Sequence, residues 1–286
     1  MLAMPQMLIF GLGYSAGVLA ARLKGPSAVG GWTVRATGRN GDLDFADRAA
    51  VEAALAGSSH VLSSVPPAPG DGDPVLAAYG EALANCGAWL GYLSSTGVYG
   101  DTGGAWVDES AAIGSGRRTA RAEADLAWQA LGARVFRLPG IYGPGRSPLD
   151  RVANGNAHRI DQPQQVFSRV HVEDIASGVV AALAGPPGVY NLADDLPASQ
   201  NAVIEEACRL LGREPPPLLS LAQARLSPMA AAFYAENRRV ANGKAGRLLG
   251  WKPAYPTFVE GLRALSATAM PVSATTTPAT ASADQR

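Results

Sequence analysis

The stretch IFGLGYSAG, residues 9–17, decides the fold of this chain of 286 residues, because it joins an apolar strand pattern to a helical one. Gly11 permits a tight turn, Gly13 leaves room for a pyrophosphate to approach the backbone, and Ala16 lets the helix pack closely. A glycine turn without a ligand is the alternative, since such turns are common. The position between the first strand and the first helix favours a dinucleotide site. The residues expected to hold the pyrophosphate are Gly11, Leu12, Gly13, Tyr14, Ser15 and Ala16.

Strand and helix patterns alternate with short connections through the first two thirds of the chain. This alternation predicts an α/β protein with a doubly wound parallel sheet, a Rossmann fold, covered by helices on both faces. Later helical patterns alternate with proline-rich loops, which predicts a smaller, mostly helical lobe over the carboxyl edge of the sheet. The expected strands are 7–11, 32–38, a short third strand that ends at Asp44 and Phe45, 60–65, 89–95 and 133–140, and the expected helices include 15–25, 48–57, 74–87, 201–212 and 256–265.

These patterns divide the chain into two parts and a tail. We expect an NAD(P)-binding Rossmann domain over residues 1–145, continued by about 165–193, and a substrate lobe over 146–164 and 194–265. The remaining residues, 266–286, are rich in Ala, Thr, Ser and Pro and hold almost no large side chains. Such a composition cannot bury enough apolar surface to offset chain entropy, so we expect a disordered tail there.

The composition limits the partners that we expect. Lys plus Arg and Asp plus Glu both number 24, so the net charge is zero, which argues against binding of a nucleic acid or an anionic membrane. The chain contains no apolar run long enough to span a membrane. Cys86 and Cys208 lack metal-ligand spacing, which favours free thiols in a reducing cytosol. We therefore expect a cytoplasmic monomer or homodimer that binds a small-molecule substrate and no metal.

The end of the second expected strand indicates which dinucleotide is bound. An NAD site has an acidic residue there that accepts hydrogen bonds from the ribose, but this strand is followed by Arg39. A guanidinium can bind a 2′-phosphate with two donors, whereas a carboxylate would repel it. A solvated surface arginine is the alternative, so NADP is the first expectation and NAD the second. Asp44 and Phe45, at the end of the short third strand, are expected to flank the adenine.

Four further motifs follow the glycine turn: SSTGVYG at 94–100, RLPGIYGPGR at 137–146, HVEDIA at 171–176 and VYNLADD at 189–195. In this order they resemble the extended short-chain dehydrogenases/reductases, the superfamily of the NAD-dependent epimerases and dehydratases. The segment LGWKPAYPTFVEGL, 249–262, resembles the usual carboxyl-terminal part of that family. The similarity covers about residues 7–265.

The resemblance implies roles for residues outside the glycine turn. Thr96 matches the position of the family's catalytic Ser or Thr, which hydrogen-bonds the substrate oxygen. The segment from Pro139 to Tyr142 would lie along the nicotinamide. Three residues would run beside the cofactor: Ser64, Val65 and Pro66.

The helix after the fifth strand departs from the family pattern. Relatives carry Tyr-x-x-x-Lys there, on one helical face, and the lysine lowers the pKa of the tyrosine so that the phenol exchanges a proton near neutral pH. An alignment on Glu123 puts Ser115 at the tyrosine position and Thr119 at the lysine position. No tyrosine of the chain has a lysine four residues further on, so the pair is absent.

Arginine is an incomplete substitute for that lysine. Tyr142 with Arg146 and Tyr234 with Arg238 have the spacing, but the first pair lies in a proline and glycine loop and the second lies far downstream. A guanidinium has no accessible neutral form, so it can anchor an anion but cannot shuttle protons. The alternative is a solvated arginine face with an Arg121–Asp125 pair. The expected helix carries three arginines: Arg117, Arg118 and Arg121.

Other polar residues add little to this site. Dehydratases of the family follow the Thr96 position with an Asp-Glu pair, but here Gly97 and Val98 follow, which weakens a dehydratase interpretation. The histidines are expected to be structural or solvated, with His171 packed within its motif.

Two functions remain open. The first is an atypical oxidoreductase or epimerase that acts slowly on a carbonyl or sugar-nucleotide-like substrate. Thr96 would orient the carbonyl, and Tyr99 or a bound water would supply the proton. The second is a non-catalytic NADP-binding sensor or regulatory protein, in which the lobe passes cofactor occupancy on to a partner. The intact glycine turn supports the first function and the missing Tyr-x-x-x-Lys pair supports the second.

Overall fold

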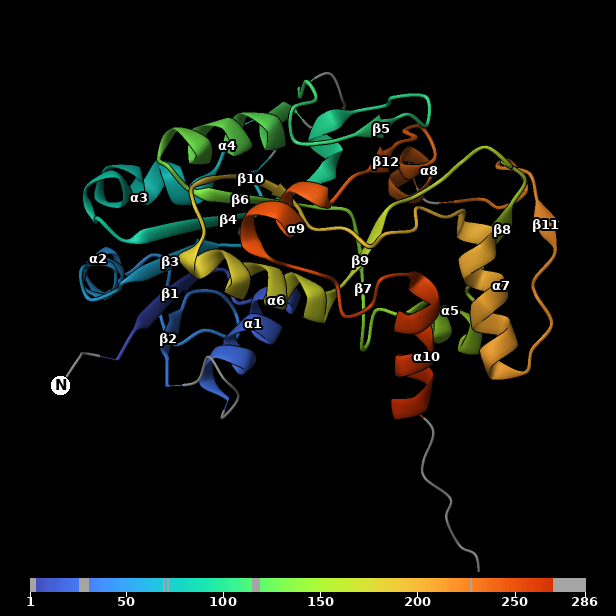
Figure 1. Ribbon diagram of the computed structural model, residues 1–286, viewed down its shortest axis with the longest axis horizontal. Coiled ribbons are helices and arrows are strands. Elements are labelled where there is room, and N and C mark those ends of the chain that lie inside the picture. Colours follow the sequence, from blue (N-terminus) through green and yellow to red (C-terminus); the bar gives the residue numbers. More distant parts are fainter. Residues whose placement is uncertain are drawn as a thin grey trace, which may run out of the picture.

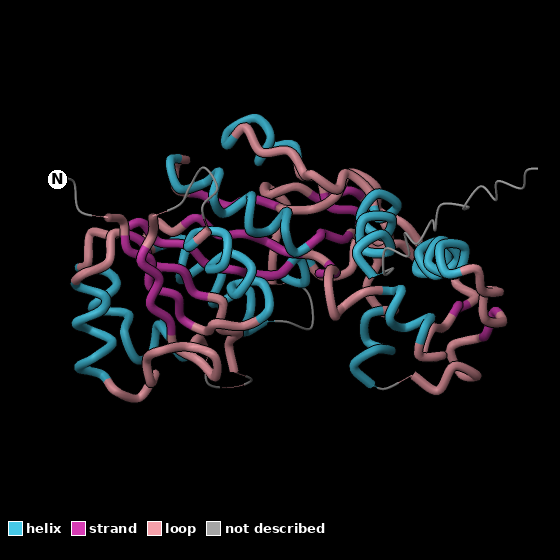
Figure 2. Tube along the Cα trace, turned by 90° about the horizontal axis from the view of Figure 1, so that it is seen from below, coloured by secondary structure: helices cyan, strands magenta, loops and turns pink. Residues whose placement is uncertain are grey.

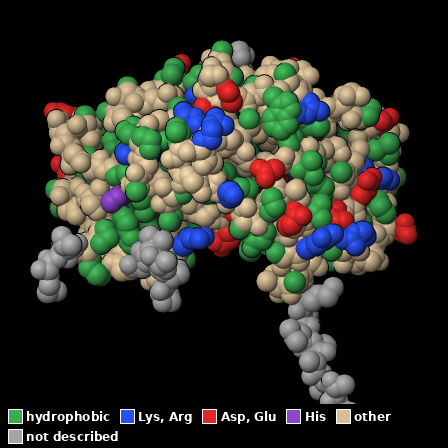
Figure 3. Space-filling model, in the orientation of Figure 1, with side chains coloured by type: hydrophobic (Ala, Val, Ile, Leu, Met, Phe, Trp, Pro, Cys, Tyr) green, Lys and Arg blue, Asp and Glu red, His purple; other side chains and the backbone are tan. Residues whose placement is uncertain are grey.

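The computed structural model describes residues 4–25, 31–68, 70, 72–114, 119–226 and 228–269. They form a sheet covered by helices and a smaller lobe beside it (Figure 1). Figure 2 shows the same two parts along a perpendicular direction, with the long strands confined to the larger part. On the face drawn in Figure 3, acidic and basic side chains are intermixed.

The central sheet has six parallel strands in the order β10-β6-β4-β3-β1-β2. The strand order therefore reverses between β1 and β3, and in open α/β sheets ligands bind at the carboxyl ends of the strands at this point. Most positions in these strands are buried, because helices cover both faces. The strands are β1 (Gln6–Phe10), β2 (Thr33–Ala36), β3 (His60–Ser63), β4 (Trp89–Ser95), β6 (Arg134–Leu138) and β10 (Gly188–Asn191).

Helices pack on both faces of the sheet and bury two apolar cores. The face that carries α1 (Tyr14–Lys24) also carries α6 (Val172–Ala181) and α9 (Gly243–Leu249), as Figure 1 shows. The opposite face carries α2 (Arg48–Ala56), α3 (Pro74–Asn85) and α4 (Thr119–Ala130). This arrangement confirms the prediction of a doubly wound α/β sheet.

Local signals set several helix ends. Asp73 caps α3, because its carboxylate accepts from the amides of Val75 and Leu76 at 2.9 and 3.0 Å. Proline at the first helical position is compatible with this start, because an N–H at that position would have no partner within the helix. The expected ends of α1 and α2 at Gly25 and Gly57 agree with the structure.

The lobe has its own apolar core, formed by α5 (Pro148–Ala153), α7 (Gln200–Leu211) and α10 (Phe258–Ala269). Four buried side chains of α7 lie on one helical face: Val203, Ile204, Ala207 and Cys208. Short elements complete the lobe and join it to the sheet. They are η1 (Thr96–Tyr99), β5 (Trp106–Val107), β7 (Gly140–Tyr142), β8 (Arg159–Ile160), β9 (Arg169–His171), η2 (Ala182–Ala184), β11 (Leu218–Leu219), α8 (Pro228–Phe233) and β12 (Arg239–Val240).

Three expectations need correction. The short third strand before Asp44 is reduced to an isolated bridge between Thr37 and Leu43. The segment 243–251 packs on the sheet and not in the lobe, because Ala245 and Trp251 are buried in the core around α6. The expected tail begins too early, since α10 continues to Ala269. Residues 270–286 lie outside the described residues.

No helix among the described residues is both long and apolar enough to cross a membrane.

Candidate functional site

A cavity of about 930 Å³ lies where the carboxyl ends of the strands face the lobe. Its volume is at the upper end of the range for small-molecule sites. At one end it meets the glycine turn through Gly13, Tyr14 and Ser15. At the other end it reaches the lobe helices through Arg151 and Ile204. One cavity therefore connects the expected dinucleotide site with the expected substrate lobe.

Gly11 makes the turn after β1. Its φ of +82° lies in the left-handed region, and a Cβ at this position would lie 2.8 Å from Cγ2 of Val65. The hydroxyl of Ser64 donates to the carbonyl of Gly11, which ties the segment after β3 to the turn. The amide of Leu12 donates to the carbonyl of Thr37 at 2.8 Å. Glycine is thus required by both the backbone angle and the close approach of β3.

The surroundings of Gly13 and Ala16 are compatible with the roles that the sequence predicts for them. A Cβ placed on Gly13 would meet no atom within 4 Å, so the cavity reaches the backbone at this point. Ala16 is only 1% exposed, in the core between α1 and α6. A pyrophosphate fits here, because the open space at Gly13 adjoins the first amides of α1.

The predicted adenosine residues differ in their surroundings. Arg39 is exposed and forms no hydrogen bond or ion pair with the described residues, so its guanidinium is available to a phosphate. Asp44 and Phe45 do not line the cavity. The Phe45 ring packs edge-on against Phe10 and Tyr79, which places it in the core beside α3. The role of Phe45 at an adenine is not supported by this packing.

Two hydroxyls stand at the end of β4. Thr96 lines the cavity and is 4% exposed, and its hydroxyl makes no hydrogen bond with any described residue. Ser95 also lines the cavity, and its hydroxyl accepts from the amide of Gly97 at 3.1 Å. Ser95 was not among the predicted site residues, although it is adjacent to Thr96 in the same motif. Either hydroxyl lies where it can donate to a ligand oxygen in the cavity.

Tyr99 does not have the position that a proton donor needs. It is 2% exposed, does not line the cavity, and donates to Oδ1 of Asn191 at 2.8 Å. Arg137 donates to the same phenol oxygen at 3.0 Å. Burial raises the pKa of Tyr99, and Arg137 only partly opposes this rise. The expectation that Tyr99 supplies a proton to a substrate is therefore corrected.

The inward face of α4 passes through Arg121 and Asp125, one turn apart. The Asp125 carboxylate is fully buried and contacts Nη2 of Arg137 at 2.8 Å, while the hydroxyl of Ser94 donates to it at 2.6 Å. Arg121 lines the cavity and donates to the hydroxyl of Tyr92 at 3.0 Å. The alternative of an Arg121–Asp125 pair is therefore wrong, because Asp125 pairs with Arg137.

The same geometry bears on the alignment that rested on Glu123. Glu123 and Thr119 are exposed and line no part of the cavity. In the described part of α4, the residue that lines the cavity is Arg121, and the assignment of Thr119 to the lysine position stays a prediction. The predictions for Ser115, Arg117 and Arg118 fall outside the described residues.

The segment after β6 forms one wall of the cavity. Pro139 and Tyr142, which the family resemblance places along the nicotinamide, both line the cavity, and Tyr142 directs its buried hydroxyl toward Gly261 of α10. Tyr14 donates to the carbonyl of Pro144 at 3.0 Å, and the guanidinium of Arg146 lies 4.6 Å from the centre of the Tyr14 ring. This wall therefore packs directly on the amino end of α1.

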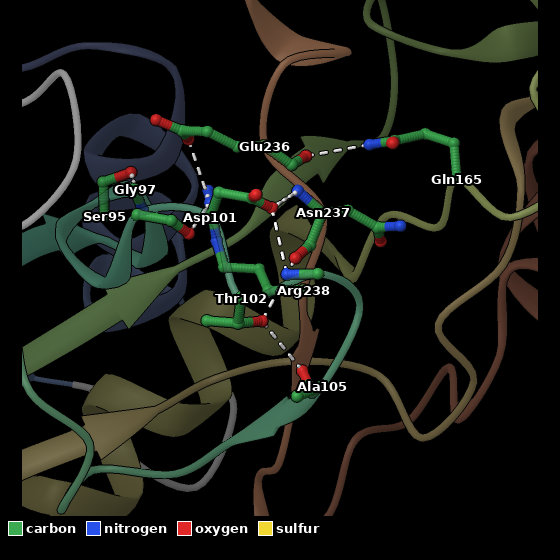
Figure 4. Close-up of polar contacts among 11 residues, drawn as sticks. Ser95, Gly97, Asp101, Thr102, Ala105, Gln165, Glu236, Asn237 and Arg238 are labelled. Carbon is green, nitrogen blue, oxygen red and sulfur yellow. Dashed lines mark hydrogen bonds and ion pairs between the residues drawn. The ribbon is translucent and has the colours of Figure 1, made fainter.

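A strap, residues 234–240, crosses from the lobe to the sheet and lines the side of the cavity near η1. Asn237 anchors the strap: its backbone amide donates to the Asp101 carboxylate at 2.8 Å, and its backbone carbonyl accepts from the backbone amides of Thr102 and Gly104. Figure 4 shows this cluster, with Gln165 donating to the carbonyl of Glu236 at 2.8 Å. The strap is thus held from both parts of the molecule.

Charged side chains on the cavity wall are mostly basic. Glu236 is the only carboxylate on the wall among the described residues, and it forms an ion pair with Arg238 at 2.9 Å. The arginines on the wall are Arg121, Arg146, Arg151, Arg169 and Arg238. Sequence reasoning missed Arg151 and Arg169, because they come from separate segments with no local motif.

The histidines differ from one another. His171 is 2% exposed and packs between Tyr142 and Tyr255. Burial lowers its pKa to about 4, so it is neutral at pH 7, as expected of a packed residue. His158 lines the lobe end of the cavity, which sequence reasoning did not detect. No group of three or more His, Cys, Asp or Glu residues that could hold a metal occurs in the described part of the chain.

Comparisons with known proteins identify similar amino-acid sequences and similar solved structures. No family model matches the chain. A conserved protein of unknown function from Silicibacter pomeroyi is 42% identical, with a TM-score of 0.81 over 93% of this chain and 100% of that one. A reductase from a Streptomyces species, the 3-diazoavenalumate denitrifying reductase, is 30% identical over 158 residues. This match covers 51% of each chain, so the chain spans about half the length of this curated relative.

More distant solved structures share the fold. A human epimerase family protein, solved with NADPH, is 16% identical with a TM-score of 0.69, over 92% of this chain and 99% of that one. The UDP-glucose 4-epimerase of Thermotoga maritima, solved with UDP-glucose, is 15% identical with a TM-score of 0.73, over 92% and 97%. The predicted fold of the extended short-chain dehydrogenases/reductases is confirmed by these likenesses.

Proposed function

Because this chain belongs to one family with the conserved Silicibacter pomeroyi protein and has the fold of the NAD-dependent epimerases and dehydratases, we propose that it is an NADP-binding oxidoreductase with an atypical active site. The substrate is a carbonyl compound that occupies the lobe end of the cavity. The observation that supports this proposal is the continuous cavity from the backbone of Gly13 to the lobe helices.

The residues at the glycine end fit a nicotinamide dinucleotide. The first amides of α1 face the open space at Gly13, and Ser64 and Pro66 line the cavity after β3. Arg39 offers an unpaired guanidinium after β2, which favours a 2′-phosphate and therefore NADP. The reduced dinucleotide would supply a hydride to the carbonyl carbon, and a proton on the carbonyl oxygen completes the two-electron reduction to an alcohol.

The chain's own contribution to this reduction is orientation. Thr96 or Ser95 donates a hydrogen bond to the carbonyl oxygen at the end of β4. With Tyr99 buried away from the cavity, the proton comes from water. A positioned acid typically contributes about 10²–10⁴ in rate, so turnover without one is slow.

A second function, an NADP-dependent sensor without turnover, is favoured by one observation. In the described part of α4, the residue that faces the cavity is Arg121, and a guanidinium cannot transfer protons. In this case cofactor binding is retained and reduction is absent.

Calorimetry tests the cofactor site directly. We expect the protein to bind NADPH more tightly than NADH, and Arg39→Asp to lower this preference by about tenfold or more, because a charge-assisted bidentate contact is lost. Gly13→Val should weaken NADPH binding by at least about a hundredfold, roughly 2.7 kcal/mol, since the side chain fills the pyrophosphate space. Gly17→Ala is the matched control, as a Cβ there also meets no atom within 4 Å but lies outside the cavity.

NADPH oxidation across a panel of aldehydes, ketones and 4-keto sugars then separates the two functions. Turnover that falls in Thr96→Val, with NADPH binding unchanged, supports the oxidoreductase. Binding without turnover on any compound supports the sensor. Gly13→Val that folds and still binds NADPH would place the dinucleotide elsewhere and contradict both.

A further inference from the structure

Arg169 is a buried cation at the lobe end of the cavity. Arg169 is 7% exposed and lines the cavity wall. The guanidinium donates to the carbonyls of Phe167 and Ala198 at 2.8 and 2.9 Å, and to Oε1 of Gln200 at 3.1 Å. These bonds use three of its five N–H donors. Arg169 forms no ion pair with any carboxylate of the described residues, so its charge is buried without a partner, which is costly.

A second guanidinium stands near Arg169. Arg151 of α5 lines the same end of the cavity and is exposed, and its guanidinium makes no hydrogen bond or ion pair with the described residues. Its positive charge is close enough to oppose the charge on Arg169. Two like charges that approach each other in a cavity indicate a place for an anion.

The carboxylate that acts most strongly on Arg169, Asp194, does not neutralise this pair. Asp194 is 2% exposed and lies behind the wall, since it does not line the cavity. Its oxygens make no hydrogen bond of ordinary geometry with the described residues, and burial raises its pKa to about 7. The acid is therefore partly protonated at neutral pH and leaves positive charge on the cavity side.

The rest of this end is apolar and aromatic. Phe167, Ile204 and Leu226 line it, and the rings of Phe167 and Tyr234 meet edge-on, 5.4 Å apart. Such a surface accommodates the carbon skeleton of a small molecule while the guanidiniums hold a charged substituent.

We propose that Arg151 and Arg169 form an anion subsite that holds a carboxylate or phosphate group of the substrate, with an apolar or aromatic body beside it. This inference rests on the proposed function for its placement of the dinucleotide at the opposite, glycine end. The anion anchors the substrate in the lobe and leaves its carbonyl free to reach the end of β4.

Calorimetry on the NADPH-saturated protein tests the subsite, because the cofactor then fills the other phosphate sites. The probes are inorganic phosphate and benzoate, which separate the two sources of charge, with benzamide as the neutral analogue of benzoate. We expect saturable binding of at least one anion, and binding about tenfold weaker in Arg151→Ala, since a hydrogen-bonded charge contact is lost. Arg209→Ala, on the exposed side of α7, is the matched control and should change affinity less than about twofold.

The variants separate the possible failures. Arg169→Gln should abolish anion binding, and if it does not fold, the exposed Arg151→Ala decides the question alone. If benzoate and benzamide bind with equal affinity, the subsite is overturned. Anion affinity that is unchanged in Arg151→Ala overturns it as well. A parallel loss of NADPH affinity in Arg151→Ala also overturns it, because Arg151 would then serve the cofactor. Absence of NADPH binding in the unmodified protein would instead contradict the proposed function, and the same anion titration without cofactor would still test the subsite.

Discussion

Two buried arginines on neighbouring parts of the molecule have opposite surroundings. Arg137 on β6 is 2% exposed and Arg169 on β9 is 7% exposed. Burial alone would lower the pKa of Arg137, but the Asp125 carboxylate at 2.8 Å raises it above its usual value. Arg169 has only carbonyl and amide acceptors, and burial lowers its pKa to about 10.

The difference separates a structural charge from one that is available to a ligand. Arg137 joins β6 to α4 through Asp125 and to η1 through Tyr99, and it does not line the cavity. Arg169 lines the cavity and has no carboxylate partner among the described residues. A buried charge with a carboxylate partner thus fixes the fold, whereas we propose that one without such a partner, on a cavity wall, holds an anionic ligand.

The largest expected effect comes from removing the partner of Arg137. Asp125→Asn leaves a buried guanidinium without a counter-charge, which typically costs about 3–5 kcal/mol of the free energy of unfolding. Urea unfolding followed by circular dichroism measures the loss. Glu123→Gln, two residues earlier on the exposed side of α4, should change the free energy of unfolding by less than about 0.5 kcal/mol. Equal losses in both variants would contradict the register assigned to α4.

The carboxylate behind Arg169 gives a pH-dependent effect. Asp194 has a raised pKa of about 7 in the folded protein, against about 3.9 in the unfolded chain. The folded state therefore binds more protons between these values, and the free energy of unfolding should fall by up to roughly 4 kcal/mol as the pH rises from about 4 to about 7.

Asp194→Asn should flatten this part of the pH profile, as measured by urea unfolding at several pH values. The exposed neighbouring residue provides the control variant, Asp195→Asn. A profile that keeps its slope in Asp194→Asn would show that another group is responsible.

Arg121 is an intermediate case, half-buried, with a neutral phenol as its hydrogen-bond partner. We expect Arg121→Ala to weaken NADPH binding by about tenfold, because it removes the charge that the cavity wall offers at α4. Thr119→Ala should have an effect below about twofold, since Thr119 is exposed and away from the cavity. Calorimetry with both variants compares the two residues, and a larger effect of Thr119→Ala would favour the alignment on Glu123.

The sequence was sufficient for the parts of this protein that depend on local signals. The glycine turn, the strand and helix alternation and the caps at Gly25 and Gly57 all lie within short stretches, and the structure agrees with them. The resemblance to a known superfamily implied that Thr96 contacts the substrate and Pro139 the nicotinamide; both residues line the cavity, and these roles stay predictions.

The remaining features depend on contacts between distant segments. Asp125 and Arg137 are twelve residues apart on different elements, and nothing in the local pattern distinguished Asp125 from Glu123. The lobe end combines Arg151 of α5, Arg169 of β9 and Gln200 of α7, which no single motif contains. Tyr99 lies in a conspicuous motif, yet its hydroxyl is directed into the core by Asn191.

The composition of the lobe core has a consequence for synthesis on the ribosome. Its three helices come from residues 148–153, 200–211 and 258–269, and the segment between the last two passes back over the sheet as α9. Translation delivers five of the six strands of the sheet, β1, β2, β3, β4 and β6, well before α10 emerges. The apolar faces of α5 and α7 therefore stay without their third partner until nearly all of the described chain has been made, and during that interval they are available to chaperones.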